Sequence, residues 1–183
     1  MSEITHQRFL GHHLSSDIES QANMLPSKYF ETTYILCMPY SGRYLPSYPK
    51  KYNGNAKNII YRSLWERKFM NYCDLNESVK EWQSEEFWIP YISPVDKRVH
   101  RYFPDFFIKY TDKSGKLRTM VIEIKPKKQV AQPNMNPKRK TKAWQNSIIT
   151  WSVNQAKWKA AREFCADRKF EFKIMTEDDL GIK

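Results

Sequence analysis

The stretch RYFPDFFIKYTDKSGKLRTMVIEIKPKK, residues 101–128, decides the fold because it is typical of two β-strands joined by a tight turn. Aromatic and β-branched residues dominate its two halves, which predicts strands over 98–111 and 116–126. Yet Asp105 and Glu123 interrupt these runs, and buried strand positions normally hold apolar side chains. The two carboxylates therefore need a specific explanation.

The turn determines which residues face each other across this hairpin. If residues 113–115 form a three-residue loop with Gly115 in the left-handed conformation, opposed residue numbers add to 228. Asp105 then lies directly across from Glu123, and the Cβ atoms of opposed residues are only ~4.5–5.5 Å apart. Strand alternation also places Lys125 on the same face as Glu123. A four-residue loop would shift this register by one residue.

Two carboxylates this close need a counter-charge, because otherwise the pKa of one of them must rise. Lys125 is one candidate counter-charge, and the group would then be a buried salt bridge between strands. A hard cation such as Mg²⁺ is the other, held by Asp105 and Glu123 with the backbone carbonyl of Ile124 as a further ligand. Such a metal would lower the pKa of a bound water, while Lys125 would stabilise charge developing on a phosphate. The residue pattern leaves both interpretations open.

A third carboxylate, Glu66, lies in a segment with helical periodicity. Apolar residues recur at three- and four-residue spacing over 58–76, which predicts an amphipathic helix. Glu66 falls at the edge of the apolar arc, about 20° past Cys73 on the helical wheel, where the helix would meet the sheet. It is a candidate third acid for the strand site. The alternative is an ordinary surface pair with Arg62, four residues earlier.

The remaining patterns complete an α/β fold. Residues 79–92 are a further strand candidate, 141–168 a second helix and 170–176 a last strand. The order helix, three strands, helix, strand predicts a central mixed sheet flanked by helices. No apolar run approaches the ~20 residues of a membrane-spanning helix, so we expect no membrane partner.

Charge divides the chain near residue 38. Residues 1–37 contain two basic and four acidic side chains, whereas 38–183 contain 29 basic and 16 acidic ones. We therefore predict a polar, flexible extension over 1–37 and one folded domain over 38–183, and we hypothesise that Met38 is the natural start. A basic excess of this size favours a polyanionic partner, nucleic acid above all. The alternative is a basic protein kept soluble by its charge.

The segment 125–142 holds seven basic residues, no acidic ones and three prolines, which predicts a loop. A basic loop beside the carboxylates suits contact with the phosphate backbone of DNA, and a solvated surface run is the alternative. The predicted DNA-binding residues are Arg62, Lys127, Lys128, Lys138, Arg139, Lys140 and Lys142.

The candidate site residues resemble a known catalytic pattern. Glu66 on a helix, the dipeptide PD at 104–105 and the tripeptide EIK at 123–125 together resemble the PD-(D/E)XK nuclease superfamily. The span from YRSLWERKFMNYCDLN through IEIKPKK is also similar to TnsA-type transposon endonucleases. The longer motifs GRYLPSYPKKYNG, YRSLWE, IEIKPKK and WSVNQAKWKAA are similar to the head-completion nucleases of T-even-type tailed phages, over roughly residues 38–180.

This resemblance implies a restriction-endonuclease-like core and Mg²⁺-dependent hydrolysis of DNA phosphodiester bonds, with Mn²⁺ as a substitute metal. It implies that Asp105 and Glu123 are metal ligands, Lys125 the catalytic lysine and Glu66 the helix acid, a further candidate ligand. It also implies action in phage head completion, after DNA packaging and before tail attachment, in the host cytoplasm or on the virion. Phage portal or connector proteins are the implied protein partners.

Two competing functions stay open. A TnsA-like or restriction-type endonuclease would use the same residues in recombination or defence. A structural head protein would keep the nuclease fold only to bind DNA. All four candidate catalytic residues are present, which favours an active enzyme.

Overall fold

The computed structural model describes residues 40–181. The predicted extension over 1–37 and the hypothetical start at Met38 lie outside the described residues. In chain order the elements are β1 (Gly42–Tyr44), η3 (Pro49–Lys51), β2 (Ile59–Tyr61), α2 (Leu64–Leu75), β3 (Val79–Gln83), β4 (Ile89–Ile92), β5 (Val99–Tyr102), β6 (Phe106–Thr111), β7 (Leu117–Ile124), α3 (Lys127–Val130), α4 (Lys142–Arg168) and β8 (Glu171–Met175).

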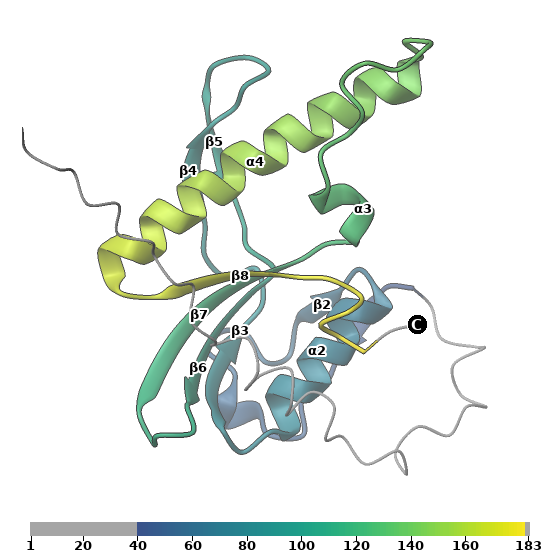
Figure 1. Cartoon of the computed structure of the whole chain (residues 1–183). Coiled ribbons are helices and arrows are strands. Elements are labelled where there is room, and N and C mark those ends of the chain that lie inside the picture. Colours follow the sequence, from purple (N-terminus) through teal and green to yellow (C-terminus); the bar gives the residue numbers. More distant parts are fainter. Residues whose placement is uncertain (1–39, 182–183) are drawn as a thin grey trace, which may run out of the picture.

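The centre of the fold is a four-stranded sheet with the order β3-β6-β7-β8 (Figure 1). The pairs β3–β6 and β6–β7 are antiparallel, whereas β7–β8 is parallel. A parallel pair needs a long crossover connection, and α4 provides it between β7 and β8. The prediction of an α/β fold with a mixed central sheet is confirmed.

The predicted hairpin register is also confirmed. Gly115 has a φ of 80°, and the Asp112 amide donates to the Lys116 carbonyl over 2.9 Å, which closes a three-residue loop. The ladder continues without a shift to the pair Phe106–Ile122, so opposed residue numbers add to 228 throughout. The next rung would join residues 105 and 123.

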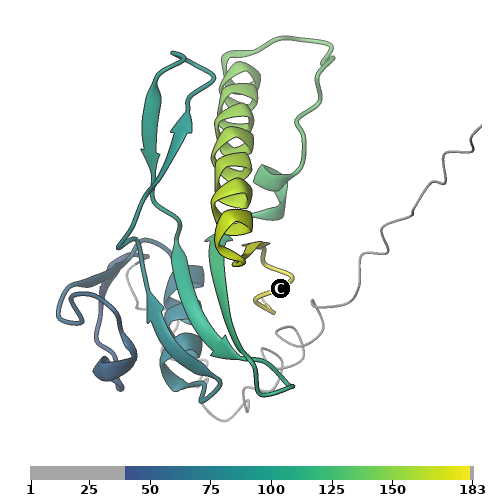
Figure 2. The ribbon, with the colours of Figure 1, turned by 90° about the vertical axis from the view of Figure 1, so that its left-hand side faces the viewer.

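Helices cover the two faces of the sheet (Figures 1 and 2). Side chains of α2 pack against one face, where the rings of Phe69 and Phe106 lie 4.8 Å apart. The opposite face carries Phe107, whose ring contacts Phe87, and Phe87 in turn stacks on Phe164 of α4. The face under α2 is therefore buried, whereas the opposite face is only partly covered and carries the Lys109–Glu81 ion pair.

A second hairpin, β4–β5, lies beside α4 rather than in the central sheet (Figure 2). Its residues Ile89, Tyr91 and Tyr102 are buried in one cluster with Ala161 of α4. The buried residues of α4 begin only at Asn154, near the middle of the helix. The first half of this 27-residue helix, which is about 40 Å long in all, therefore projects beyond the packed core.

The helix prediction over 58–76 was wrong at its start. Residues 59–61 form β2, which pairs with β1, and the helix begins only at Leu64. Ser63 adopts an extended conformation and its hydroxyl accepts a hydrogen bond from the Glu66 amide, so it caps the helix. The apolar spacing of the segment does not reveal this boundary.

The strand predictions over 79–92 and 98–111 each merged two strands. The first is interrupted at 84–88, where Glu85 has a φ of 53° that a continuous strand does not allow. The second is interrupted at 103–105, where Pro104 has no amide hydrogen to donate to a ladder. The predicted loop over 125–142 also contains one short helix, α3.

The predicted helix over 141–168 and the last strand over 170–176 match α4 and β8 to within a residue. Among residues 40–181, no helix combines the length and the apolar character that crossing a membrane requires.

Candidate active site

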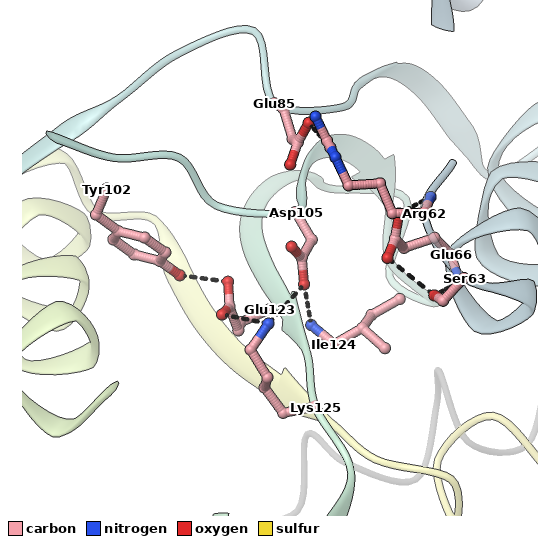
Figure 3. A network of polar contacts seen from close by, with 9 residues as sticks. All are labelled: Arg62, Ser63, Glu66, Glu85, Tyr102, Asp105, Glu123, Ile124 and Lys125. Carbon is pink, nitrogen blue, oxygen red and sulfur yellow. Dashed lines mark hydrogen bonds and ion pairs between the residues drawn. The ribbon is translucent and has the colours of Figure 1, made fainter. Parts of the chain in front are cut away.

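Three charged side chains meet where β7 leaves the sheet (Figure 3). Lys125 Nζ lies 2.9 Å from Glu123 Oε1 and 3.7 Å from Asp105 Oδ2. The Glu123 side chain is only 4% exposed, the Asp105 side chain 16% and the Lys125 side chain 25%. The sequence-based expectation that these three residues lie together is therefore met, at an edge that opens to solvent.

Pro104 explains why Asp105 turns into this site. In an antiparallel ladder, hydrogen-bonded pairs alternate with pairs that share no hydrogen bond. Asp112 and Lys116 form a hydrogen-bonded pair, so every second pair counted from them is expected to be hydrogen-bonded too. Residues 104 and 124 would form a hydrogen-bonded pair, but a proline has no amide hydrogen to donate. The Ile124 amide instead donates to Asp105 Oδ2 over 2.7 Å.

The missing ladder hydrogen bond at Pro104 also affects the Ile124 carbonyl. The amide and the carbonyl of one strand residue point to the same side, so the carbonyl of Ile124 faces the Asp105 side of β7. Pro104 is unable to donate a ladder hydrogen bond to it. On the other side of the strand, the Lys125 amide donates to the Met175 carbonyl over 2.9 Å, which fixes the backbone of the site to β8.

Tyr102 is a buried member of the site that sequence reasoning missed. Its hydroxyl donates to Glu123 Oε2 over 2.7 Å, so both oxygens of Glu123 have partners. The ammonium of Lys157 lies 5.6 Å from the centre of the Tyr102 ring. No periodicity singles out this tyrosine, because it belongs to β5 of the second hairpin and reaches the site only through tertiary packing.

The electrostatics of the site follow from burial. Burial, and then the neighbouring Glu123, raise the pKa of Asp105 to about 7. Burial alone would lower the pKa of Lys125, but Asp105 and Glu123 outweigh this effect and raise it. When both carboxyl groups are ionised, the charged lysine leaves one excess negative charge, which would favour binding of a further cation.

The donor set at the end of β7 suits Mg²⁺. Two carboxylates and a backbone carbonyl are hard oxygen ligands, and Mg²⁺ is commonly held by one or two carboxylates together with waters and substrate phosphates. Within residues 40–181, His, Cys, Asp and Glu side chains nowhere gather in threes at a spacing that would hold a metal ion. Asp105 and Glu123 alone would hold Mg²⁺ only if waters and substrate oxygens completed its coordination.

Glu66 lies at the same end of the sheet, but its carboxylate oxygens accept hydrogen bonds at the start of α2. Its Oε1 accepts from the Ser63 hydroxyl over 2.8 Å, and its Oε2 accepts from the Arg62 amide over 2.8 Å. Its negative charge is a minor cause of the raised pKa of both Asp105 and Lys125, after burial and the closer charged groups. The structure thus brings Glu66 near the strand residues without direct contact (Figure 3).

The sequence-based alternative for Glu66, a charge pair with the Arg62 side chain, was wrong. The backbone amide of Arg62 makes the contact, while its guanidinium forms an ion pair with Glu85. Glu85 lies in the left-handed region at the end of β3, and this partner is a second feature that sequence reasoning missed.

The predicted DNA-binding lysines do not gather at the site. Lys127, at the start of α3, pairs with Asp178 over 2.7 Å, and Lys128 is exposed beside it. The segment 131–141 runs from the end of α3 to the outer end of α4, away from the central sheet (Figure 1). The exposed residues at or next to this outer end are Lys138, Arg139, Lys140 and Lys142.

Comparison with known proteins agrees with this geometry. Residues 76–177, which include β3 to β8 and three of the four candidate catalytic residues, match the family model described as TnsA-like endonuclease N terminal. The chain is 43% identical over 147 residues to the head completion nuclease of Enterobacteria phage T4, and the match covers 78% of this chain and 95% of that protein. The phage head completion nuclease is similar in sequence to this chain over most of its length. This chain therefore belongs to the TnsA-like endonuclease family.

Proposed function

We propose that this protein is a Mg²⁺-dependent DNA endonuclease that acts in phage head completion. The observation that carries the proposal is the buried pair of Asp105 and Glu123 with Lys125 between them. The family relationship supports nuclease chemistry, and the similarity to the phage head completion nuclease supports the biological setting.

In this proposal Asp105, Glu123 and the Ile124 carbonyl hold the metal, and Mn²⁺ can replace Mg²⁺. The metal, when bound, polarises a phosphoryl oxygen and lowers the pKa of a water. Lys125 orients the attacking water or stabilises negative charge on the phosphate. Glu66 adds negative charge at the same end of the sheet and is a candidate further ligand. Tyr102 holds Glu123 in place through its hydroxyl.

DNA is the proposed substrate, and the basic excess of the chain would attract it. Arg62, between β2 and α2, and Lys128, in α3, are candidate phosphate contacts close to the site in the fold. The basic residues at the outer end of α4 would contact DNA further along its length. The host cytoplasm during infection, association with the virion, and contact with portal or connector proteins are parts of this proposal.

The test is cleavage of supercoiled plasmid and branched DNA with Mg²⁺, with Mn²⁺ and with EDTA. We expect cleavage in either metal, none in EDTA, and none by Asp105→Asn or Lys125→Ala. Lys109→Ala is the matched control, because Lys109 pairs with Glu81 over 2.9 Å on the sheet outside the site. Full activity of Asp105→Asn would overturn the proposed site.

A related candidate is an endonuclease of recombination, which the TnsA-like family match favours. Association of the protein with purified phage capsids would support head completion, and its absence would support recombination. A non-catalytic structural role would show as DNA binding without cleavage of any DNA form.

A further inference from the structure

The β4–β5 hairpin has one apolar face that does not contact α4. Strand alternation and the pairs Ile89–Tyr102 and Ile92–Val99 assign every residue of the hairpin to one of two faces. One face packs in the cluster with Ala161 of α4. The other, which we call the outer face, consists of exposed side chains: Trp88, Pro90, Ile92, Val99, Arg101 and Phe103.

The outer face is more apolar than a solvated hairpin requires. Val99 is 71% exposed and Ile92 is 64% exposed, and Val95 at the hairpin tip is 64% exposed. A contiguous group of exposed apolar residues marks an interaction surface rather than ordinary surface variation. The outer face is therefore a candidate interaction surface.

The outer face leads directly into the candidate active site. Phe103 ends the outer face, Pro104 follows, and Asp105 is the next residue. Figure 2 shows the hairpin rising from the end of the central sheet where β6 begins. A ligand that extends from Asp105 in this direction would pass over the outer face.

Charge and ring chemistry identify the class of ligand. Residues 88–103 contain three basic side chains and one acidic side chain, Asp96, which is already paired with His100 over 2.9 Å. The guanidinium of Arg101 lies 5.0 Å from the centre of the Trp88 ring on the outer face. Aromatic rings beside an arginine suit DNA, because bases stack on aromatic rings and arginine pairs with phosphate.

We propose that the outer face of the β4–β5 hairpin is a DNA-binding surface that holds the strand entering the active site. This inference rests on the proposed function and deepens it, because it names the path of the substrate. Trp88 and Phe103 contact bases or sugars near the cleaved bond, Arg101 contacts a phosphate, and the hairpin tip contacts DNA further away.

The test measures DNA binding in EDTA, where cleavage does not occur, by fluorescence anisotropy of a labelled duplex and a labelled branched DNA. We expect Val99→Glu and Ile92→Glu to raise Kd about tenfold or more, because each places a negative charge on the DNA path. Leu117→Glu is the matched control, since Leu117 is 58% exposed at the opposite end of β7, and it should bind like the wild type. Arg101→Ala should reduce the salt dependence of log Kd by about one unit.

A photo-crosslinking amino acid at position 99 identifies the occupant directly. A crosslink to DNA supports the inference. A crosslink to a second copy of the chain or to another phage protein overturns it and assigns the face to a protein interface. Equal Kd values for Val99→Glu, Ile92→Glu and the Leu117→Glu control also overturn it.

A cleavage assay of the wild type distinguishes failure of this inference from failure of the proposed function. If the wild type cleaves DNA and requires Asp105 while the outer-face variants bind normally, only the inference fails. If the outer-face variants lose binding but the wild type cleaves no DNA in Mg²⁺ or Mn²⁺, the proposed function fails.

Discussion

The hydroxyl of Tyr102 donates a hydrogen bond to Glu123 over 2.7 Å inside the protein. We predict that Tyr102→Phe lowers the free energy of unfolding by about 1.5–3 kcal/mol, because a hydrogen bond to a buried charged group is lost. It should also raise the Mg²⁺ concentration needed for half-maximal cleavage, since Glu123 is then held by Lys125 alone. Urea unfolding and a Mg²⁺ titration measure these two effects.

Tyr110→Phe is the control for this prediction. The Tyr110 hydroxyl approaches Glu171 only to 3.4 Å, in a partly buried position, so its removal should have a smaller effect on stability and none on the Mg²⁺ titration. A normal Mg²⁺ titration for Tyr102→Phe would show that the tyrosine is structural only.

The raised pKa of Asp105 predicts a pH-dependent stability difference. Because the pKa of Asp105 is higher in the folded protein than in the unfolded chain, its contribution is most favourable at low pH and is lost as pH rises towards about 7. In EDTA, Asp105→Asn should therefore be more stable than the wild type at pH 8, by about 1–3 kcal/mol, and should lose this advantage at pH 4. Mg²⁺ should stabilise only the wild type.

Thermal unfolding of both proteins from pH 4 to pH 8 checks this prediction. Taking the difference between the two proteins removes the effect of other groups, such as Asp112, whose pKa is lowered by its hydrogen bond with Ser114 and by other partners. A stability difference that does not change with pH would contradict the raised pKa.

Lys125 balances two buried carboxylates, so its removal should destabilise the fold as well as abolish cleavage. We predict that Lys125→Ala lowers the free energy of unfolding by about 3 kcal/mol at pH 8, as expected when one partner of a buried ion pair is removed. The loss should be smaller at pH 5, where Asp105 takes up a proton. Lys109→Ala, which breaks a more exposed pair, should cost about 1 kcal/mol or less.

Variants of Glu66 and Ser63 distinguish a role in helix capping from a role in catalysis. Gln replaces Glu in a capping box, so Glu66→Gln should change stability by less than about 1 kcal/mol. If the charge of Glu66 serves the active site, the same variant should cleave DNA at least tenfold more slowly. Ser63→Ala should show the reverse, a loss of about 1 kcal/mol in stability with normal cleavage by the folded protein. Normal cleavage by both variants would assign Glu66 to capping alone.

The outer end of α4 should bind DNA without affecting the chemistry. Replacing Lys138, Arg139, Lys140 and Lys142 by Ala should weaken DNA binding and reduce its salt dependence by up to about one unit for each lysine or arginine in contact with a phosphate. Thermal stability and the Mg²⁺ titration should stay unchanged. An unchanged salt dependence would assign these residues to a solvated surface.

Local chemistry explains why the hairpin register was predictable. Gly115 supplies the left-handed residue of a three-residue loop, and this loop places position 105 opposite Glu123. The period of strand alternation then places Lys125 beside Glu123 without further information. The core of the candidate site follows from two short-range rules.

The parts that sequence reasoning missed depend on contacts distant in sequence. Residues 59–61 have the same apolar character in a strand as in a helix, and only pairing with β1 selects the strand. Tyr102 contacts Glu123 and Glu85 contacts Arg62, and both come from segments that were predicted as parts of two longer strands. The outer end of α4 shows the limit of charge patterning, because a basic run is recognisable in the sequence whereas its distance from the site is not.

The bond between the Lys125 amide and the Met175 carbonyl has a consequence for the order of folding. β8 is parallel to β7 and follows the long crossover helix, so this pairing joins residues about 50 positions apart and is expected to form late. During synthesis, the ribosome exposes both carboxylates well before it makes the strand that holds their backbone. If the proposed site is correct, a nascent chain would thus carry every candidate catalytic residue and remain without nuclease activity until β8 has docked.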